Sequence, residues 1–131
     1  MGVSVRSPYR HDGGEWLLGN LHTHTTRSDG PLSPQKTINA YAALGHGFLM
    51  LSDHDQLTDP AGLDSKGMVL IPGNELSANG PHMLHVDART RLEPGADRQA
   101  VIDAVNAEGG FVIVNHPNWE RHFNHCPQEC L

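Results

Sequence analysis

Two histidines separated by one residue, His22 and His24, lie in the polar stretch NLHTHTTRSDG. In a β-strand alternate side chains face the same side, so both imidazoles project together while Thr23 points away. Such a pair suits one divalent metal ion, and the Asp29 carboxylate further along adds a second ligand type. On a helix the spacing would have to be three or four, so the metal interpretation depends on a strand here. Taken alone, an HxH motif is equally compatible with exposed or core histidines.

Further polar residues follow the apolar segments of the chain, where each expected strand ends: His54, Glu75 and His116. In α/β folds, ligands and catalytic groups gather at the carboxyl ends of the strands. Mixed histidine and carboxylate ligands suit zinc, manganese or iron, and a carboxylate can bridge two ions. Asp53 and Asp55 flank His54 and are expected to orient its imidazole, with solvated loop charges as the alternative. The combined spacing favours a metal cluster.

The segment HMLHVDA requires a choice between two histidines. His82 and His85 are three residues apart, so they face opposite sides of an extended chain. The alternate set resembles a face packed against helices: His82, Leu84, Val86 and Ala88. We therefore expect His85 to face the interior with the other ligands, and His82 to be a loop residue or one that supports the ligands.

The elements that must position these residues are apolar runs alternating with two helical patterns. The expected strands are 15–24, 47–55, 68–76 with a Pro-Gly turn, 82–88 and 111–117. Helices are expected over 33–45 and 97–110, with Ser33 and Asp97 as their caps and Gly45 and Gly109 near their ends. Apolar strands that alternate with helices predict an α/β domain with a covered, mostly parallel sheet. A closed eightfold barrel needs about 250 residues, so the sheet is open or the chain is part of a longer protein.

Composition limits the function classes. The 131 residues suit one domain. We find neither a run of about 20 apolar residues, which a membrane-spanning helix requires, nor a signal peptide. We therefore expect a cytoplasmic protein without a membrane partner. A net charge of −6 argues against a surface that binds nucleic acid non-specifically, although it leaves a nucleotide substrate open. Cys126 and Cys130 fit no disulfide framework; with His122 and His125 they form either a small metal cluster or, as we expect, reduced surface thiols.

The segments HTHTTRSDG, SDHD, GNELS, HMLHV and NHP resemble, in this order, the metal motifs of the polymerase and histidinol phosphatase (PHP) superfamily. The resemblance extends from about residue 16 to residue 118. It implies a distorted, seven-stranded β/α barrel of TIM-like type, with a metal cluster at the carboxyl ends of its strands. The fold class expected from this resemblance is therefore α/β, as a partial or distorted barrel with mostly parallel strands.

The resemblance also implies two or three divalent ions (Zn, Mn or Fe) held by seven residues: His22, His24, Asp29, His54, Glu75, His85 and His116. The first two histidines would hold one ion, which Glu75 bridges to a second ion. His85 and His116 would complete the second ion, so these two residues and Glu75 are the expected catalytic residues. Asp29 and His54 would bind a third ion.

One departure from the family pattern concerns its closing Asp-x-His pair, which does not follow His116. The missing aspartate would complete the first ion and the missing histidine the third. We therefore expect residues 1–131 to be a single PHP-like domain without the C-terminal part of the barrel, either as a truncated chain or as a naturally short relative.

The function expected from these residues is metal-dependent hydrolysis of phosphate esters, on a phosphomonoester, a nucleotide or a nucleic-acid end, by metal-activated water. The chain has no GxSxG motif and no P-loop. Arg27 is a candidate phosphate contact or a solvated loop residue. One alternative is a PHP-like hydrolase of carboxylic or carbamate esters. Another is an inactive metal-binding scaffold fragment, which pairs with itself or another chain through an open sheet edge.

Overall fold

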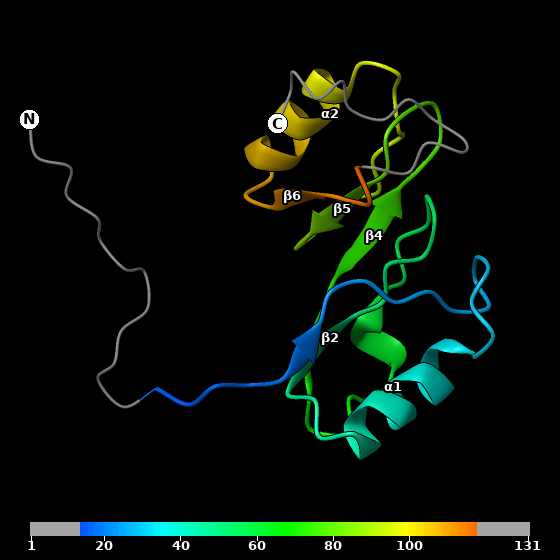
Figure 1. Cartoon of the computed structure of the whole chain (residues 1–131), viewed down its shortest axis with the longest axis vertical. Helices are drawn as coiled ribbons and strands as arrows, with labels where there is room; N and C mark the ends of the chain where they lie inside the picture. Colours follow the sequence, from blue (N-terminus) through cyan, green and yellow to red (C-terminus); the bar gives the residue numbers. More distant parts are fainter. Residues whose placement is uncertain (1–13, 118–131) are drawn as a thin grey trace, which may run out of the picture.

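The computed structural model describes residues 14–117, which form two three-stranded sheets (Figure 1). The first sheet is parallel and has the order β1 (Gly19–Asn20), β2 (Phe48–Met50), β3 (Val69–Ile71). The second is antiparallel and has the order β4 (Gly73–Leu76), β5 (Met83–Val86), β6 (Phe111–Val114). The predictions for the two cysteines and for their neighbouring histidines lie outside the described residues.

Three helical segments connect the strands: α1 (Pro34–Ala43), the short 3₁₀ helix η1 (Pro60–Gly62) and α2 (Arg98–Ala107). Both long helices begin where the sequence predicts. Ser33 precedes α1, and the Asp97 side chain accepts a hydrogen bond from the Ala100 backbone N–H in the first turn of α2. After the helices, Gly45 and Gly109 have φ angles of 79° and 88°, a conformation that favours glycine.

The segment 68–76, predicted as one strand, crosses from one sheet to the other. Pro72 separates β3 from β4 and offers no backbone N–H to a ladder. A Cβ atom on Gly73 would lie 2.1 Å from Met50 Sδ and 2.6 Å from the His85 backbone oxygen, so only glycine fits this crossing. The chain then continues forward as β4 instead of turning back. A parallel bridge between His54 and Glu75 joins the end of β2 to β4, which brings the two sheets together at the carboxyl end of β2.

Each of the two α-helices covers one sheet (Figure 1). A third apolar cluster lies between the sheets. Ile38 of α1 packs on the parallel sheet, whereas Val101 and Val105 of α2 pack on the antiparallel sheet. The third cluster joins Met50 to Leu84 and Val86 of β5. The fold is thus mixed α/β, as expected, but its second sheet is antiparallel, and residues 14–117 form no closed barrel.

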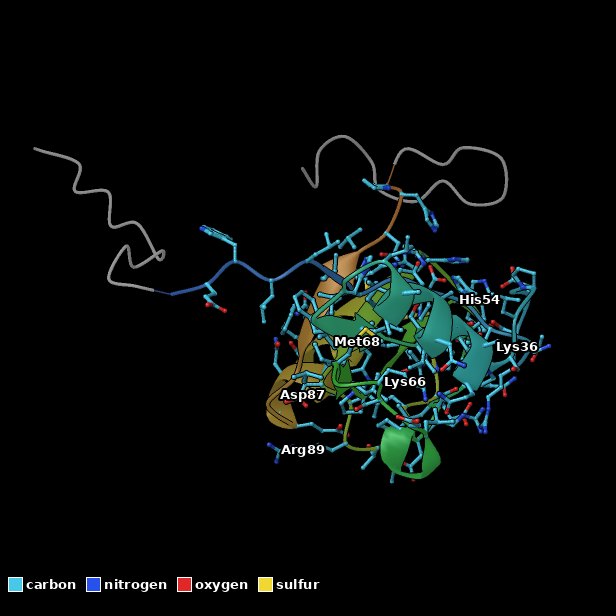
Figure 2. All side chains as sticks on the ribbon, turned by 90° about the horizontal axis from the view of Figure 1, so that it is seen from below. Lys36, His54, Lys66, Met68, Asp87 and Arg89 are labelled. Carbon is cyan, nitrogen blue, oxygen red and sulfur yellow. The ribbon has the colours of Figure 1, made fainter. Side chains whose placement is uncertain are left out.

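The antiparallel pairing has a simple cause in chain length. Only six residues separate β4 from β5, and a parallel connection requires a crossover of about a dozen residues or more. The residues that follow β5 therefore lie far from the carboxyl end of β2, on the other side of the molecule. Figure 2 shows this separation, with His54 on one side of the molecule and Asp87 and Arg89 on the other. In residues 14–117, no helix has the length and apolar character needed to cross a membrane.

Candidate metal centre

Glu75 of β4 is the centre of the histidine cluster, and its side chain is 1% exposed. Its Oε2 atom lies 3.3 Å from His22 Nε2, 3.2 Å from His24 Nε2 and 3.1 Å from His54 Nδ1. The two nitrogens of the HxH pair are themselves 3.1 Å apart, so these imidazoles face the same side although β1 ends at Asn20. Three predicted ligands from two loops thus converge on one carboxylate oxygen.

The other oxygen of Glu75 faces residues from the antiparallel sheet. Oε1 accepts a hydrogen bond of 2.6 Å from the Asn115 side-chain amide. It also lies 3.2 Å from His82 Nδ1 and 3.5 Å from His116 Nε2. Asn115 and His116 follow β6 directly, and His82 immediately precedes β5. Because β5 runs antiparallel to its neighbours, the start of this strand, rather than its end, reaches the cluster.

Asp29 extends the cluster toward solvent. Its carboxylate lies 3.3 Å from His24 Nδ1 and 3.7 Å from His54 Nε2, and its side chain is 69% exposed. Ser77 contacts His54 at Nδ1, the same nitrogen that faces Glu75. The exposed Asp29 carboxylate and the buried Glu75 carboxylate therefore contact different nitrogens of the same two imidazoles, or lie close to them.

Asp53 holds the loop that carries His24 and Asp29. This carboxylate is fully buried, and it accepts hydrogen bonds from the Thr25 N–H at 2.7 Å and the Thr25 hydroxyl at 2.8 Å. The Ser28 and Thr58 hydroxyls donate to it as well, at 2.8 and 3.1 Å. The expectation that Asp53 orients His54 is therefore wrong, because the donors of the neighbouring loop occupy both of its oxygens.

Asp55, also expected to orient His54, has a different role. Its carboxylate accepts hydrogen bonds from the backbone N–H groups of Ser77 at 2.7 Å and Ala78 at 3.1 Å. These contacts fix the loop that follows β4. The hydroxyl of Ser77 and the carboxylate of Glu75, rather than the flanking aspartates, contact the His54 ring.

The structure exchanges the expected positions of His82 and His85. Glu75 pairs with Leu84 across the strands, and His85 pairs with Asn74, so His85 lies on the sheet face opposite to Glu75. Helix α2 covers that face, and the His85 ring is fully buried with Glu108 at 3.8 Å from Nε2. The set that includes His82, Leu84 and Val86 instead faces the space between the sheets. Both faces of β5 are buried, so the sequence pattern could not show which one α2 covers.

The residues around Glu75 fit divalent metal ions. Within residues 14–117, three groups have ligand atoms within 4.8 Å of one another: His22, His24 and Glu75; His24, Asp29 and His54; and His54, Glu75 and His82. A tetrahedral ion with bonds of about 2.1 Å separates its ligand atoms by about 3.4 Å. The separations of 3.1 to 3.3 Å in the first group are close to that value. Imidazole and carboxylate together are the ligands of zinc, manganese and iron sites.

The pKa shifts in the cluster are those expected of a site that binds a cation. Burial alone would raise the pKa of Glu75, but the contacts with His22, His24 and Asn115 outweigh burial and hold this pKa far below its usual range. The hydrogen bond to Glu75 raises the pKa of His24, whereas burial lowers that of His82. Glu75 thus stays negatively charged and attracts a positive charge. A divalent ion can supply that charge in place of a proton.

Two contacts to Glu75 are missing from the sequence-based ligand set. Asparagine is common in turns, so the residue type of Asn115 alone does not indicate a contact with the ligands. An alternation signal was available, because Ile113 and Asn115 are two residues apart and therefore share a face of an extended chain. His82 had no such signal, because its selection depends on the antiparallel direction of β5.

The different positions of His82 and His85 lead to a paired prediction. His82→Ala removes an imidazole that faces Glu75, and we expect it to lower the affinity for Mn²⁺ or Zn²⁺ by at least about 10-fold. His85→Leu replaces a buried ring without a hydrogen-bond partner among the described residues, so we expect near-normal stability and unchanged metal affinity. Equilibrium dialysis with metal analysis measures both. Loss of metal in the His85 variant alone would restore the sequence-based assignment.

The fold and the cluster together define a class, a mixed α/β fold with a histidine–carboxylate centre. The same fold occurs in a two-domain protein from Bacteroides vulgatus that contains a predicted PHP-like metal-dependent phosphoesterase. The TM-score is 0.67 at 20% identity, over 86% of this chain and 39% of that one. At this identity the likeness shows a shared fold alone. No protein-family model matches the chain.

Two curated relatives are both named as exoribonucleases. A 5'-3' exoribonuclease of Haemophilus influenzae is 42% identical over 64 residues, which are 46% of this chain and 23% of that enzyme. The 5'-3' exoribonuclease Rnm of Salmonella typhimurium is 34% identical over 77 residues, 53% of this chain and 26% of that enzyme. The matched part thus spans about a quarter of the length of each relative.

Proposed function

We propose that this protein is a metal-dependent phosphoesterase that acts on nucleic-acid ends or nucleotides. The observation that carries the proposal is the convergence of five imidazoles and one amide on the buried Glu75 carboxylate. The fold shared with a protein containing a PHP-like phosphoesterase supports the reaction type, and the two exoribonuclease relatives support the substrate class.

The proposed ligand set replaces His85 by His82 and is otherwise the set expected from the sequence: His22, His24, Asp29, His54, Glu75, His82 and His116. Glu75 is the shared ligand, since its two oxygens face different histidines. Asn115 fixes the rotation of this carboxylate through its hydrogen bond to Oε1. We propose that this ligand set holds two or three divalent ions, which are zinc, manganese or iron.

Divalent ions in such a site supply a bound water of lowered pKa and stabilise negative charge on phosphoryl oxygens. The residues of this chain leave one side of the cluster accessible, because the His22 side chain is 36% exposed and Asp29 is more exposed still. Glu75 and Asn115 themselves are buried beneath these exposed groups. We propose that a substrate phosphate approaches the cluster from the side of the loop 22–32.

The test compares three substrates after metal removal and reconstitution with Mn²⁺ or Zn²⁺. We expect metal-dependent hydrolysis of a 5'-phosphorylated RNA oligonucleotide or of a nucleotide ester, and little hydrolysis of a carboxylic ester. Faster cleavage of the carboxylic ester would support the carboxyl-ester alternative instead. Metal binding without hydrolysis of any of the three substrates would contradict the proposal and favour a metal-binding scaffold.

A further inference from the structure

A pocket of about 330 Å³ opens directly beside the candidate metal centre. It lies between the loop 22–32 and helix α1, and its lining includes His22, His24, Pro31, Leu32, Thr37 and Tyr41. This volume is at the lower end of the range of small-molecule sites, about 300–1,000 Å³. The pocket therefore has room for one compact group next to the atoms that face Glu75.

The lining of the pocket is suited to an uncharged group. Neither lysine nor arginine is among the residues that the structure places around it, so a phosphate has no cationic partner there. Pro31 and Leu32 supply apolar contact, and the Leu32 side chain is 40% exposed in the loop. A substrate whose phosphate binds at the metal centre would thus place its neutral part in this pocket.

Two hydroxyl groups give the pocket unused hydrogen-bonding capacity. Thr37 is only 4% exposed, and its Oγ1 atom has no hydrogen-bond partner among the described residues. A buried hydroxyl left unpaired costs about 1–3 kcal/mol, so a ligand or a water that reaches this hydroxyl would gain a favourable hydrogen bond. The Tyr41 hydroxyl oxygen accepts hydrogen bonds from the Asn20 amide at 2.7 Å and the Thr23 hydroxyl at 3.1 Å, so its position is fixed and its own proton is available.

We propose that this pocket binds the nucleoside adjacent to the scissile phosphate, which rests on the phosphoesterase function proposed above. The base or sugar packs against Pro31 and Leu32. The hydroxyls of Thr37 and Tyr41 hydrogen-bond to its oxygen or ring-nitrogen atoms. Both hydroxyls can donate or accept, so the pocket selects a nucleoside over a simple alkyl or aryl group while discriminating only modestly among bases.

The kinetic test uses Thr37→Val and Leu32→Trp, which remove a hydroxyl and fill the pocket, with Asn39→Ala on the exposed side of α1 as the matched control. We expect KM for a ribonucleotide substrate to rise about tenfold in the first two variants, a loss within the range for one bound base. We expect unchanged metal content and a smaller loss on bis(p-nitrophenyl) phosphate than on the ribonucleotide, whereas Asn39→Ala should leave kcat/KM on both substrates unchanged. Equal loss on both substrates, or no change on the ribonucleotide, would overturn the proposal.

A binding test separates this proposal from the catalytic one. Uridine and adenosine, which carry no phosphate, are titrated into the metal-free protein, and the backbone amide signals of residues 30–41 are followed by NMR. Shifts at Thr37 and Tyr41 that disappear with Leu32→Trp would support the pocket even if the protein hydrolysed nothing. Absence of such shifts at millimolar nucleoside would overturn the pocket even if the protein were an active phosphoesterase.

Discussion

Glu75→Gln is expected to lower the affinity for divalent metal by more than the roughly 10- to 100-fold loss typical of residues that only support a ligand. The amide has no charge, and its NH₂ group must face either the imidazoles near Oε2 or the Asn115 amide near Oε1. Either orientation replaces a shared acceptor with a donor. Hydrolysis should fall in proportion to metal occupancy. Metal analysis by mass spectrometry, together with rates at saturating Mn²⁺, measures the effect.

Glu93→Gln is the matched control for this substitution. Its side chain is 80% exposed and forms an ion pair with Arg91, at 3.2 Å. Metal content and rate should remain those of the unmodified protein, and stability should change by less than about 0.5 kcal/mol. If Glu75→Gln retained full metal occupancy, Glu75 would not be the shared ligand of the cluster.

Asp53→Ala is expected to give the largest loss of stability, about 3 kcal/mol or more, because it leaves the Thr25 N–H and three hydroxyls without their buried acceptor. Asp53→Asn should cost less, since hydroxyl groups can rotate to accept from an amide. Urea denaturation of the metal-free protein measures both changes. Because Thr25 and Ser28 anchor the loop of Asp29, metal affinity should fall as well.

Asp103→Ala on α2 is the control for Asp53. Its exposed carboxylate accepts one hydrogen bond, from Gln99 at 2.8 Å, so its loss should be within about 0.5 kcal/mol. Equal stabilities of the Asp53 and Asp103 variants would show that the buried carboxylate does not hold the loop.

Local chemistry made part of this fold predictable. Pro34 begins α1, Asp97 caps α2, and the glycines that end both helices adopt left-handed conformations, all of which depend on neighbouring residues alone. The pairing of His22 with His24 belongs to the same group, because alternation in an extended chain is also local. These features required no knowledge of how the sheets pack.

The other features of the fold and the site depend on contacts between residues far apart in the sequence, which cannot be predicted from one sequence. The crossing at Pro72 and Gly73 depends on how closely Met50 approaches, and the direction of β5 depends on its partner strands. That direction decides between His82 and His85. The donors that surround Asp53 come from the loop 25–28 and from Thr58, and nothing in the sequence indicates that they meet. The ligand roles of the seven proposed residues remain predictions.

The central claim is that the groups around Glu75 bind divalent metal. A crystal of the protein grown with Mn²⁺, measured at the manganese absorption edge, tests it most directly. We predict an anomalous peak within about 2.0–2.2 Å of His22 Nε2, His24 Nε2 and a Glu75 oxygen, with further peaks beside His54. A fully ordered cluster without any anomalous peak, at Mn²⁺ concentrations in the millimolar range, would contradict the claim.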